Sequence, residues 1–368
     1  ANPRGLSGHP GLRREMEDRK QRFDAKTEVR KKIEDVVKKL FANVSPFDGV
    51  HVFTPHADVP DDSALRLVVL PPEQSYIKED PRAVNEVVLE QLRTHGSHPR
   101  HRANRLIFLA ADHAVLARLR DATKTALAWA SIVEDVEEDR LVIDQLQKKQ
   151  AEKELASANA VLPKAARECF KWLICPVQDD PTATKPNIEA FPLNTSSGTA
   201  PGELERVCNE NELVISTWSP IHLRSKLKEL YWKPEKPAVG AMAFWEDSLR
   251  YLYLPRLKTR ETLAAVVRTG ASSSDFFGTA YGSKDGKYEG FSLGEGGVSF
   301  DDTLLLIEPE AAKQYAAELK KAIAVPPPEA GKPSTPITGA GPTTVTTEPG
   351  KKTGAPGTPT AAKAKSFH

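Results

Sequence analysis

The stretch Asn104-Arg-Leu-Ile-Phe-Leu-Ala-Ala-Asp112 decides the fold class. Leu106 to Ala110 are consecutive apolar residues, so they cannot alternate between a buried and a solvated face. A strand of this kind is covered on both faces, as parallel strands are. Apolar residues at helical spacing follow as far as about Ile132, and Asp112 stands at the N-cap position, where a carboxylate accepts from the free N–H groups of the first turn.

A second strand-then-helix unit precedes this one. The strand is Arg66-Leu-Val-Val-Leu-Pro-Pro72, and the helix covers residues 84–92, with valines and leucines on one face. Val50 to Phe53 form a further short strand. Repeated strand–helix units predict an α/β fold with a partial parallel sheet and flanking helices.

Segments of different composition divide the chain. We expect a charged helical lead-in at residues 1–48, the α/β unit at 49–135, a long helical arm at 136–177, a linker loop at 178–202, a winged-helix-like α+β module at 203–324 and a disordered Pro/Thr-rich linker at 325–368. The first half of the arm has few apolar residues, so it must project into solvent or span between domains. Pro163 predicts a kink or a restart within it.

The second half of the chain combines helices with a small ribbon. Helices are predicted at 202–211, 219–231, 241–254 and 261–269, followed by strands at 279–281, 288–293 and 304–307. Lys284-Asp-Gly-Lys287 is a strong hairpin signal between the first two strands. Several helices followed by an antiparallel ribbon suggest a winged-helix-like module.

Composition restricts the class of protein. The net charge is +1, so any attraction to nucleic acid must come from a local patch. The chain has neither a run of about 18 apolar residues nor a signal-peptide pattern, so we expect a cytoplasmic protein without membrane contact. Cys169, Cys175 and Cys208 lack C-x-x-C spacing, which predicts buried reduced thiols and no zinc site.

Several segments together resemble one family. RLVVLPPE at 66–73, NRLIFLAAD at 104–112, LAWASI at 127–132, WLICPV at 172–177 and YLYLPRL at 251–257 are similar, in the same order, to the domain-of-unknown-function 499 family. Its members are large bacterial P-loop ATPases of the AAA+ type, often encoded in phage-defence clusters. The resemblance covers about residues 25–310 and implies ATP and Mg²⁺ in a longer parent protein, with DNA, defence-cluster proteins and the rest of the ATPase chain as partners.

The residues for ATP hydrolysis are missing from this sequence. A phosphate-binding loop needs two glycines bracketing four residues, then Lys and Ser or Thr. Before Gly331-Lys-Pro-Ser334 and Gly350-Lys-Lys-Thr353, the position of the first glycine holds Pro326 and Val345. Asp112 could also hold Mg²⁺ as a Walker B acid, but His113 follows where a second acid is needed, so N-capping is preferred. We predict no complete catalytic site here and an ATPase only in the parent protein.

A basic loop precedes the central strand. Its candidates for nucleotide or phosphate contact are Arg100, Arg102 and Arg105, whose guanidinium groups can pair with phosphate oxygens or act as an arginine finger for a neighbouring subunit. Plain surface charge is the alternative interpretation. His95, His98 and His101 lie close together, but no Cys or acid accompanies them and Pro99 breaks a helix, which argues against a metal site.

Aromatic residues gather in the second half beside further basic ones. Helical spacing makes most of them core residues, although a stacking platform for bases is the alternative. The aromatic residues are Trp218, Tyr231, Trp232, Trp245, Tyr251 and Tyr253, and the nucleic-acid contact candidates are Arg250, Arg256, Lys258 and Arg260.

These observations lead to one hypothesis and one rival. The hypothesis is a non-catalytic C-terminal portion of an AAA+-type ATPase of a phage-defence system, which couples ATP hydrolysis in the parent protein to remodelling of DNA or partner proteins. The rival is a protein–protein interaction scaffold of a defence complex that binds no nucleic acid.

Overall fold

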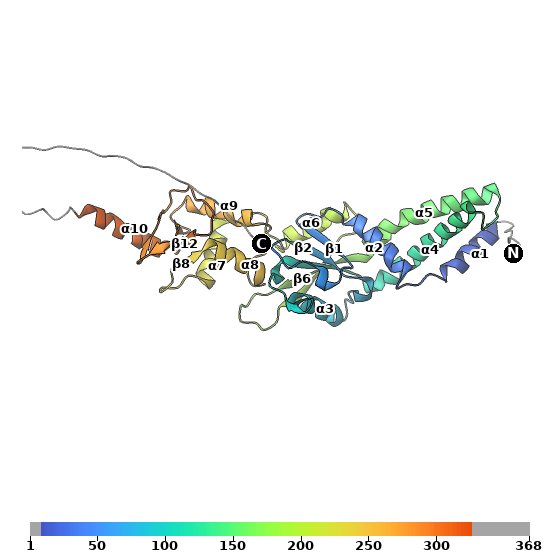
Figure 1. Ribbon diagram of the computed structural model, residues 1–368, viewed down its shortest axis with the longest axis horizontal. Coiled ribbons are helices and arrows are strands. Elements are labelled where there is room, and N and C mark those ends of the chain that lie inside the picture. The colour runs from blue at the N-terminus through green and yellow to red at the C-terminus, as the bar shows by residue number, and fades with distance from the viewer. Residues whose placement is uncertain (1–8, 326–368) are drawn as a thin grey trace, which may run out of the picture. The chain divides into compact units, whose positions relative to one another are not determined.

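The computed structural model describes residues 9–325, and its centre is a five-stranded mixed sheet (Figure 1). The strands are β1 (Gly49–Val52), β2 (Arg66–Val69), β5 (Leu106–Ala111), β6 (Phe170–Val177) and β7 (Asn187–Pro192), in the order β1-β2-β5-β6-β7. β1, β2 and β5 are parallel, whereas β6 pairs antiparallel with both β5 and β7. Two parts of the predicted organisation lie outside the described residues. They are residues 1–8 of the charged lead-in and all of the Pro/Thr-rich linker at 325–368 except Val325.

The central strand behaves as its apolar run predicted. All six residues of β5 are buried. Ile107 and Leu109 pack in the core on one face of the sheet, and Phe108 packs in the core on the other. Asp112 ends the strand and caps α4 (His113–Glu137) by accepting from the backbone N–H of Ala114 at 3.0 Å. The α/β fold class and the N-cap are therefore confirmed.

The end of the predicted helical arm is a strand instead. Residues 170–177 form β6, because Trp172-Leu-Ile-Cys175 is another continuous apolar run that needs cover on both faces. The predicted linker at 178–202 contains β7, an edge strand whose residues are exposed or half-buried. α6 (Ala200–Glu210) packs into the same core through Leu204 and Cys208. The α/β unit therefore continues well beyond residue 135.

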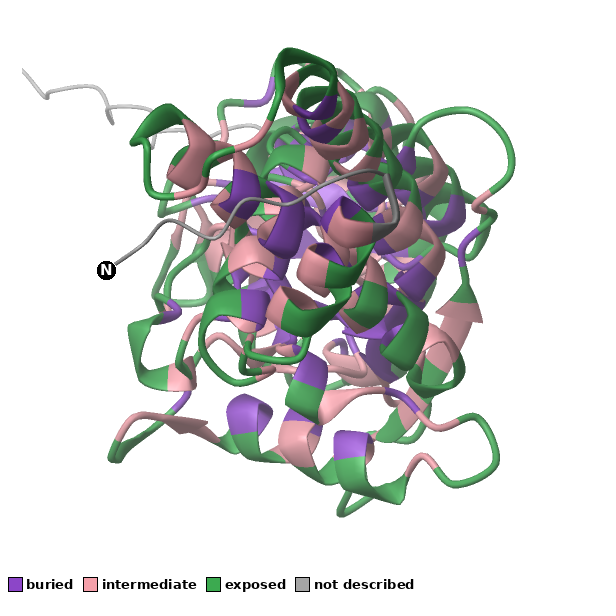
Figure 2. Ribbon diagram, turned by 90° about the vertical axis from the view of Figure 1, so that its right-hand side faces the viewer, coloured by how far each residue is buried: buried purple, intermediate pink, exposed green. Residues whose placement is uncertain are grey.

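The remainder of the arm is a helix pair. α4 and α5 (Gln145–Cys169) lie side by side, and α1 (His9–Lys20) packs on them through Leu12 and Met16 (Figure 1). Figure 2 looks at the molecule from this end and shows buried residues mainly toward the middle and exposed residues at the outside. α5 continues through Pro163 without a restart, and both Pro163 and Asn159, the residue whose carbonyl loses its N–H partner, are exposed.

Other helices near the sheet follow the sequence pattern with one exception. The charged lead-in was predicted as one helix, but it breaks at Asp24, whose carboxylate accepts from the N–H of Lys26 and forms a turn before α2 (Glu28–Leu40). α3 (Arg82–Arg93) buries its valine stripe. A hairpin of β3 (Thr94–His95) and β4 (His98–Pro99) joins α3 to β5.

The second half of the chain has a core of its own. Its helices are α7 (Pro220–Leu230), α8 (Ala241–Arg250) and α9 (Arg260–Ala271), and its antiparallel sheet is β8 (Ala238–Gly240), β12 (Leu305–Ile307) and β9 (Gly278–Ala280), in that order. The hairpin of β10 (Ser283–Lys284) and β11 (Lys287–Tyr288) lies between β9 and β12, and α10 (Pro309–Ala324) follows. The order helix, strand, two helices and two strands, with the first strand paired to the last, resembles that of a winged helix, and we call residues 220–308 the winged-helix module. Phe244, Leu263 and Phe277 are among its buried residues.

None of the helices in residues 9–325 combines the length and the apolar character needed to cross a membrane. Cys169, Cys175 and Cys208 are buried free thiols, as predicted.

Candidate nucleic-acid interface

Arg100, from the basic loop, is part of the fold. Its guanidinium group is buried and donates to the carbonyl oxygens of Gln91 at 2.9 Å, Pro60 and Val59 at 3.1 Å, and His56 at 3.2 Å. Burial lowers the pKa of this side chain from its ordinary value, although Asp61 opposes the shift. All three guanidinium nitrogens of Arg100 donate to backbone carbonyl oxygens, and the side chain is not exposed to a phosphate in solvent. The predicted phosphate contact is therefore wrong for Arg100.

Arg105 links the sheet to the winged-helix module. Its guanidinium group donates to the carbonyl oxygens of Ser63 at 2.9 Å, Leu257 at 2.6 Å and Lys258 at 2.9 Å. Only 2 % of the residue is exposed. Burial, followed by the positive charge of Arg256, lowers the pKa of Arg105 to about 10. Arg105 is a structural arginine, and the predicted nucleotide contact is wrong for it too.

Arg256 makes the reciprocal connection from the winged-helix module. It donates to the carbonyl oxygens of Asn104 and Leu213, both at 2.9 Å, and of Pro176 at 3.2 Å, and its Nη1 lies 3.2 Å from the Sγ of Cys175. The residue is 6 % exposed, so its predicted contact with nucleic acid is wrong. The physical reason is shared by all three arginines. Loops that meet at a buried junction leave carbonyl oxygens without partners, and a guanidinium group supplies five donors.

The other predicted basic residues keep their charges at the surface. Arg102 forms a 3.0 Å ion pair with Glu246 of α8 and is about one-third exposed. Arg250 is exposed, with its guanidinium carbon 5.4 Å from the centre of the Tyr251 ring. Arg260 is exposed at the first residue of α9, and Lys258 is half-buried before it. These four stay candidates for anion contact. The histidine loop forms the β3–β4 hairpin, and among residues 9–325 no group of three metal-ligating side chains occurs.

The solvent face of α9 presents small and basic side chains. Ala265, Thr269 and Ser272 are exposed, and Arg268 pairs with Glu261 on the same face. α9 follows α8 in the chain, and in helix-turn-helix proteins the second of two consecutive helices enters the major groove. The sequence prediction identified this helix but missed Arg268, whose spacing of seven residues from Glu261 places both on one face.

The hairpin between β9 and β12 adds two lysines. Lys284 and Lys287 are exposed on either side of the turn, where Asp285 and Gly286 adopt positive φ angles of 53° and 78°. The turn was predicted from its Asp-Gly sequence, but the lysines were read only as part of the hairpin signal. We call the β10–β11 hairpin the wing, and we use the name α9–wing surface for the exposed residues of α9, its C-cap and the wing: Arg260, Arg268, Thr269, Ser272, Lys284 and Lys287.

Most of the large aromatic residues are core residues, as expected. Trp232 and Trp245 are 7 % and 5 % exposed, and the Trp232 indole donates to the carbonyl oxygen of Leu306 at 3.0 Å. Tyr231 donates to Asp247 at 2.8 Å, and burial together with that carboxylate raises the pKa of Tyr231. Tyr251 and Tyr253 are only half-buried and stack on each other.

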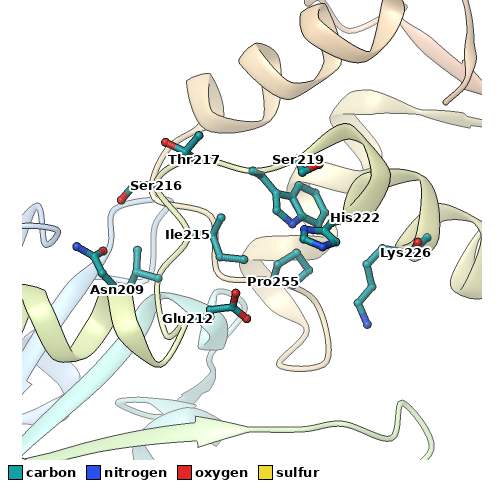
Figure 3. Close-up of a pocket in the computed structure, with 12 residues that line it drawn as sticks. Asn209, Glu212, Ile215, Ser216, Thr217, Ser219, His222, Lys226 and Pro255 are labelled. Carbon is teal, nitrogen blue, oxygen red and sulfur yellow. The ribbon is translucent and has the colours of Figure 1, made fainter. Parts of the chain in front are cut away.

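A separate groove of about 770 Å³ lies where α6 joins α7 (Figure 3). Figure 3 shows Asn209 and Glu212 on one side of it and His222 and Lys226 of α7 on the other. No side-chain hydrogen bond between described residues joins Glu212 to His222 or Lys226.

Comparisons with known proteins add no relative. The sequence matches no family model and no curated protein, and the fold matches no solved structure. The resemblance to the 499 family therefore stays a prediction.

Proposed function

We propose that this chain is a non-catalytic, cytoplasmic portion of a DNA-acting ATPase and that its winged-helix module contacts duplex DNA through the α9–wing surface. The association with ATP, Mg²⁺ and phage defence rests on the sequence resemblance alone. The contact with DNA rests on the arrangement of α9 and the wing.

The observation that carries the proposal is the exposed face of α9 with a lysine-bearing hairpin in the same module. B-DNA admits an α-helix into its major groove, and small side chains such as Ala265 and Thr269 let a helix approach closely. Arg260, Lys284 and Lys287 are exposed and supply positive charge for phosphates. Acidic neighbours such as Glu261 and Asp285 limit the total charge, so we expect moderate, salt-sensitive binding.

Coupling to an ATPase requires a firm connection between the module and the sheet. Arg105 and Arg256 cross the junction in opposite directions, and the Asn104 amide adds donations to the carbonyl oxygens of Ser248 at 2.8 Å and Leu254 at 3.1 Å. Such buried bonds are costly to break, because each leaves an unsatisfied polar group. A displacement of the sheet would then be carried into the winged-helix module.

The test is a salt titration of the affinity for a short labelled duplex, followed by fluorescence anisotropy. A triple variant with Arg260→Gln, Lys284→Gln and Lys287→Gln removes exposed charge without disturbing the core. Each lost phosphate contact should lower the slope of log K against log salt by about one unit, and affinity should fall similarly for unrelated sequences. The matched control replaces Lys149, Lys153 and Lys164, three exposed lysines of α5, with Gln.

Two results would contradict DNA binding. One is no binding by the unmodified protein at low salt, and the other is an α9–wing variant whose affinity and salt slope match those of the α5 control.

A protein–protein scaffold is the second candidate, and exposed apolar side chains favour it. Leu146 at the start of α5 is 66 % exposed, and Ile323 on α10 is 84 % exposed. Interaction surfaces expose such residues. Capture of a defence-cluster protein that survives nuclease treatment and is lost on Leu146→Ser would support this candidate.

A further inference from the structure

A groove of about 480 Å³ is lined by four separate segments: the end of α3, Ala103 before β5, the loop before β7, and the last residue of α8 with the residues that follow it. Every charged residue that lines it is basic: Arg93, Lys185 and Arg250. Arg93 is partly neutralised by Glu90, 2.8 Å away on α3. Lys185 is exposed, and no ion pair of described residues includes it. The groove therefore attracts anions.

One wall of this groove is aromatic. The rings of Tyr251 and Tyr253 lie 5.2 Å apart between centres with planes 15° apart, so they are stacked. The guanidinium carbon of Arg250 lies 5.4 Å from the centre of the Tyr251 ring. Both tyrosines are half-buried, in contrast to Trp232 and Trp245 in the core, so ring surface is left for a ligand.

We propose that this groove binds a nucleobase that carries a phosphate, as an unpaired nucleotide of a single strand or as a free nucleotide. The base would continue the stack on the Tyr251–Tyr253 pair, because bases and aromatic side chains stack face to face. The phosphate would meet Lys185 and Arg93 at the rim. Ligand sites of this kind occupy about 300–1,000 Å³, and the groove falls in that range.

The lining chemistry also defines selectivity. Leu89, Leu92 and Pro186 offer apolar contact, and the uncharged polar side chains of the lining are those of Gln178, Thr184 and the two tyrosines. Stacking on an aromatic ring is sequence-tolerant, because every base has a flat face. The site therefore accepts different bases, and its affinity falls as salt rises. It is separate from the α9–wing surface and does not depend on duplex binding.

The experiment measures binding of an end-labelled oligothymidine to the full chain at low salt by fluorescence anisotropy. Tyr251→Leu keeps apolar contact but removes the ring, and it should weaken binding about fivefold or more, the loss expected for one stacked base. Lys185→Glu, on an exposed loop where folding is not at risk, should also weaken binding, whereas Lys164→Glu on α5 should leave it unchanged.

Competitors distinguish the two sources of the nucleotide. If AMP and dTMP compete at a concentration close to that of the nucleotides in the oligothymidine, the groove is a free-nucleotide site. If only unlabelled oligonucleotide competes, the groove is a strand site. The triple α9–wing variant should retain binding in either case. The proposal is overturned if neither probe binds, if Tyr251→Leu and Lys185→Glu both leave affinity unchanged, or if inorganic phosphate competes as well as a nucleotide does.

Discussion

Arg100, Arg105 and Arg256 have the same chemistry as Arg260, yet the fold uses them in the opposite way. The first three are buried among backbone carbonyl oxygens, and Arg260 is exposed at a helix start. From the sequence, all four were candidates for contact with phosphate or nucleic acid, because arginine side chains are typical of a solvated surface. What separates them is the position of loops distant in sequence, such as Ser63 and Leu257 around Arg105, and no local pattern encodes that.

Replacement of Arg256 by Met should reduce stability rather than DNA affinity. The change leaves the carbonyl oxygens of Asn104, Leu213 and Pro176 without this donor, and unsatisfied buried groups cost about 1–3 kcal/mol each. We expect a loss of about 3 kcal/mol in the free energy of unfolding, measured by urea denaturation. Arg260→Met, the exposed control, should change it by less than about 0.5 kcal/mol. Equal stability of the two variants would contradict the structural role of Arg256.

The three cysteines should be unreactive in the native protein. Burial raises the pKa of Cys169 and of Cys208 to about 12, and it also raises the pKa of Cys175, where Arg256 partly offsets it. The thiolate is the reactive form, and a raised pKa makes it scarcer than in an exposed cysteine. A thiol reagent that is detected by its colour should label no cysteine of the folded protein at pH 8. After urea is added, it should label all three. Rapid labelling of the folded protein would show that one of these thiols is accessible.

At the scale of elements, segments with a clear local signal were predicted correctly. An apolar run without a boundary signal and an edge strand were not. β5, α4 and the turn at Lys284–Lys287 are where the sequence predicted them, since each has a local cause: an apolar run, an N-cap and an Asp-Gly turn. β6 was assigned to a helix because its apolar run directly follows the helical residues of α5. β7 escaped notice because an edge strand with half-exposed residues resembles a loop.

Hydrogen exchange should distinguish β6, as a strand in the sheet, from the helical arm and linker that were predicted in this part of the sequence. Backbone N–H groups of β6 bond to β5 and β7 on its two sides, so their exchange requires opening of the sheet. We expect the amides of residues 171–175 to exchange as slowly as those of β5, and the amides of residues 179–185, apart from Pro181, which has none, to exchange rapidly. Fast exchange in 171–175 would contradict the central place of β6 in the sheet.

At the scale of the whole molecule, the α/β fold class was predicted correctly, but residues 203–214 were assigned to the second module although they pack with the sheet. The residues up to Val214 belong to the core of the sheet, and the core of the winged-helix module includes Leu223 and Phe244. A boundary is visible only when the partners of α6 are known, because its own sequence is amphipathic and would suit either core. The same is true of the α9–wing surface. The sequence predicted α9, but the face of α9 that is exposed depends on the residues that pack against the helix.

ATP hydrolysis by this chain alone should not exceed background. The sequence contains no phosphate-binding loop, and Asp112, the one candidate for a Walker B acid, accepts from the N–H of Ala114 and lies 3.1 Å from the Lys171 ammonium group. Asp112→Ala should cost about 1 kcal/mol of stability through loss of the helix cap and should leave phosphate release at the background level. Phosphate release is measured with ATP and Mg²⁺, with urea denaturation run in parallel on both proteins. Turnover above background that disappears in a folded Asp112→Ala variant would instead assign Asp112 to metal binding, and the non-catalytic interpretation of the chain would be wrong.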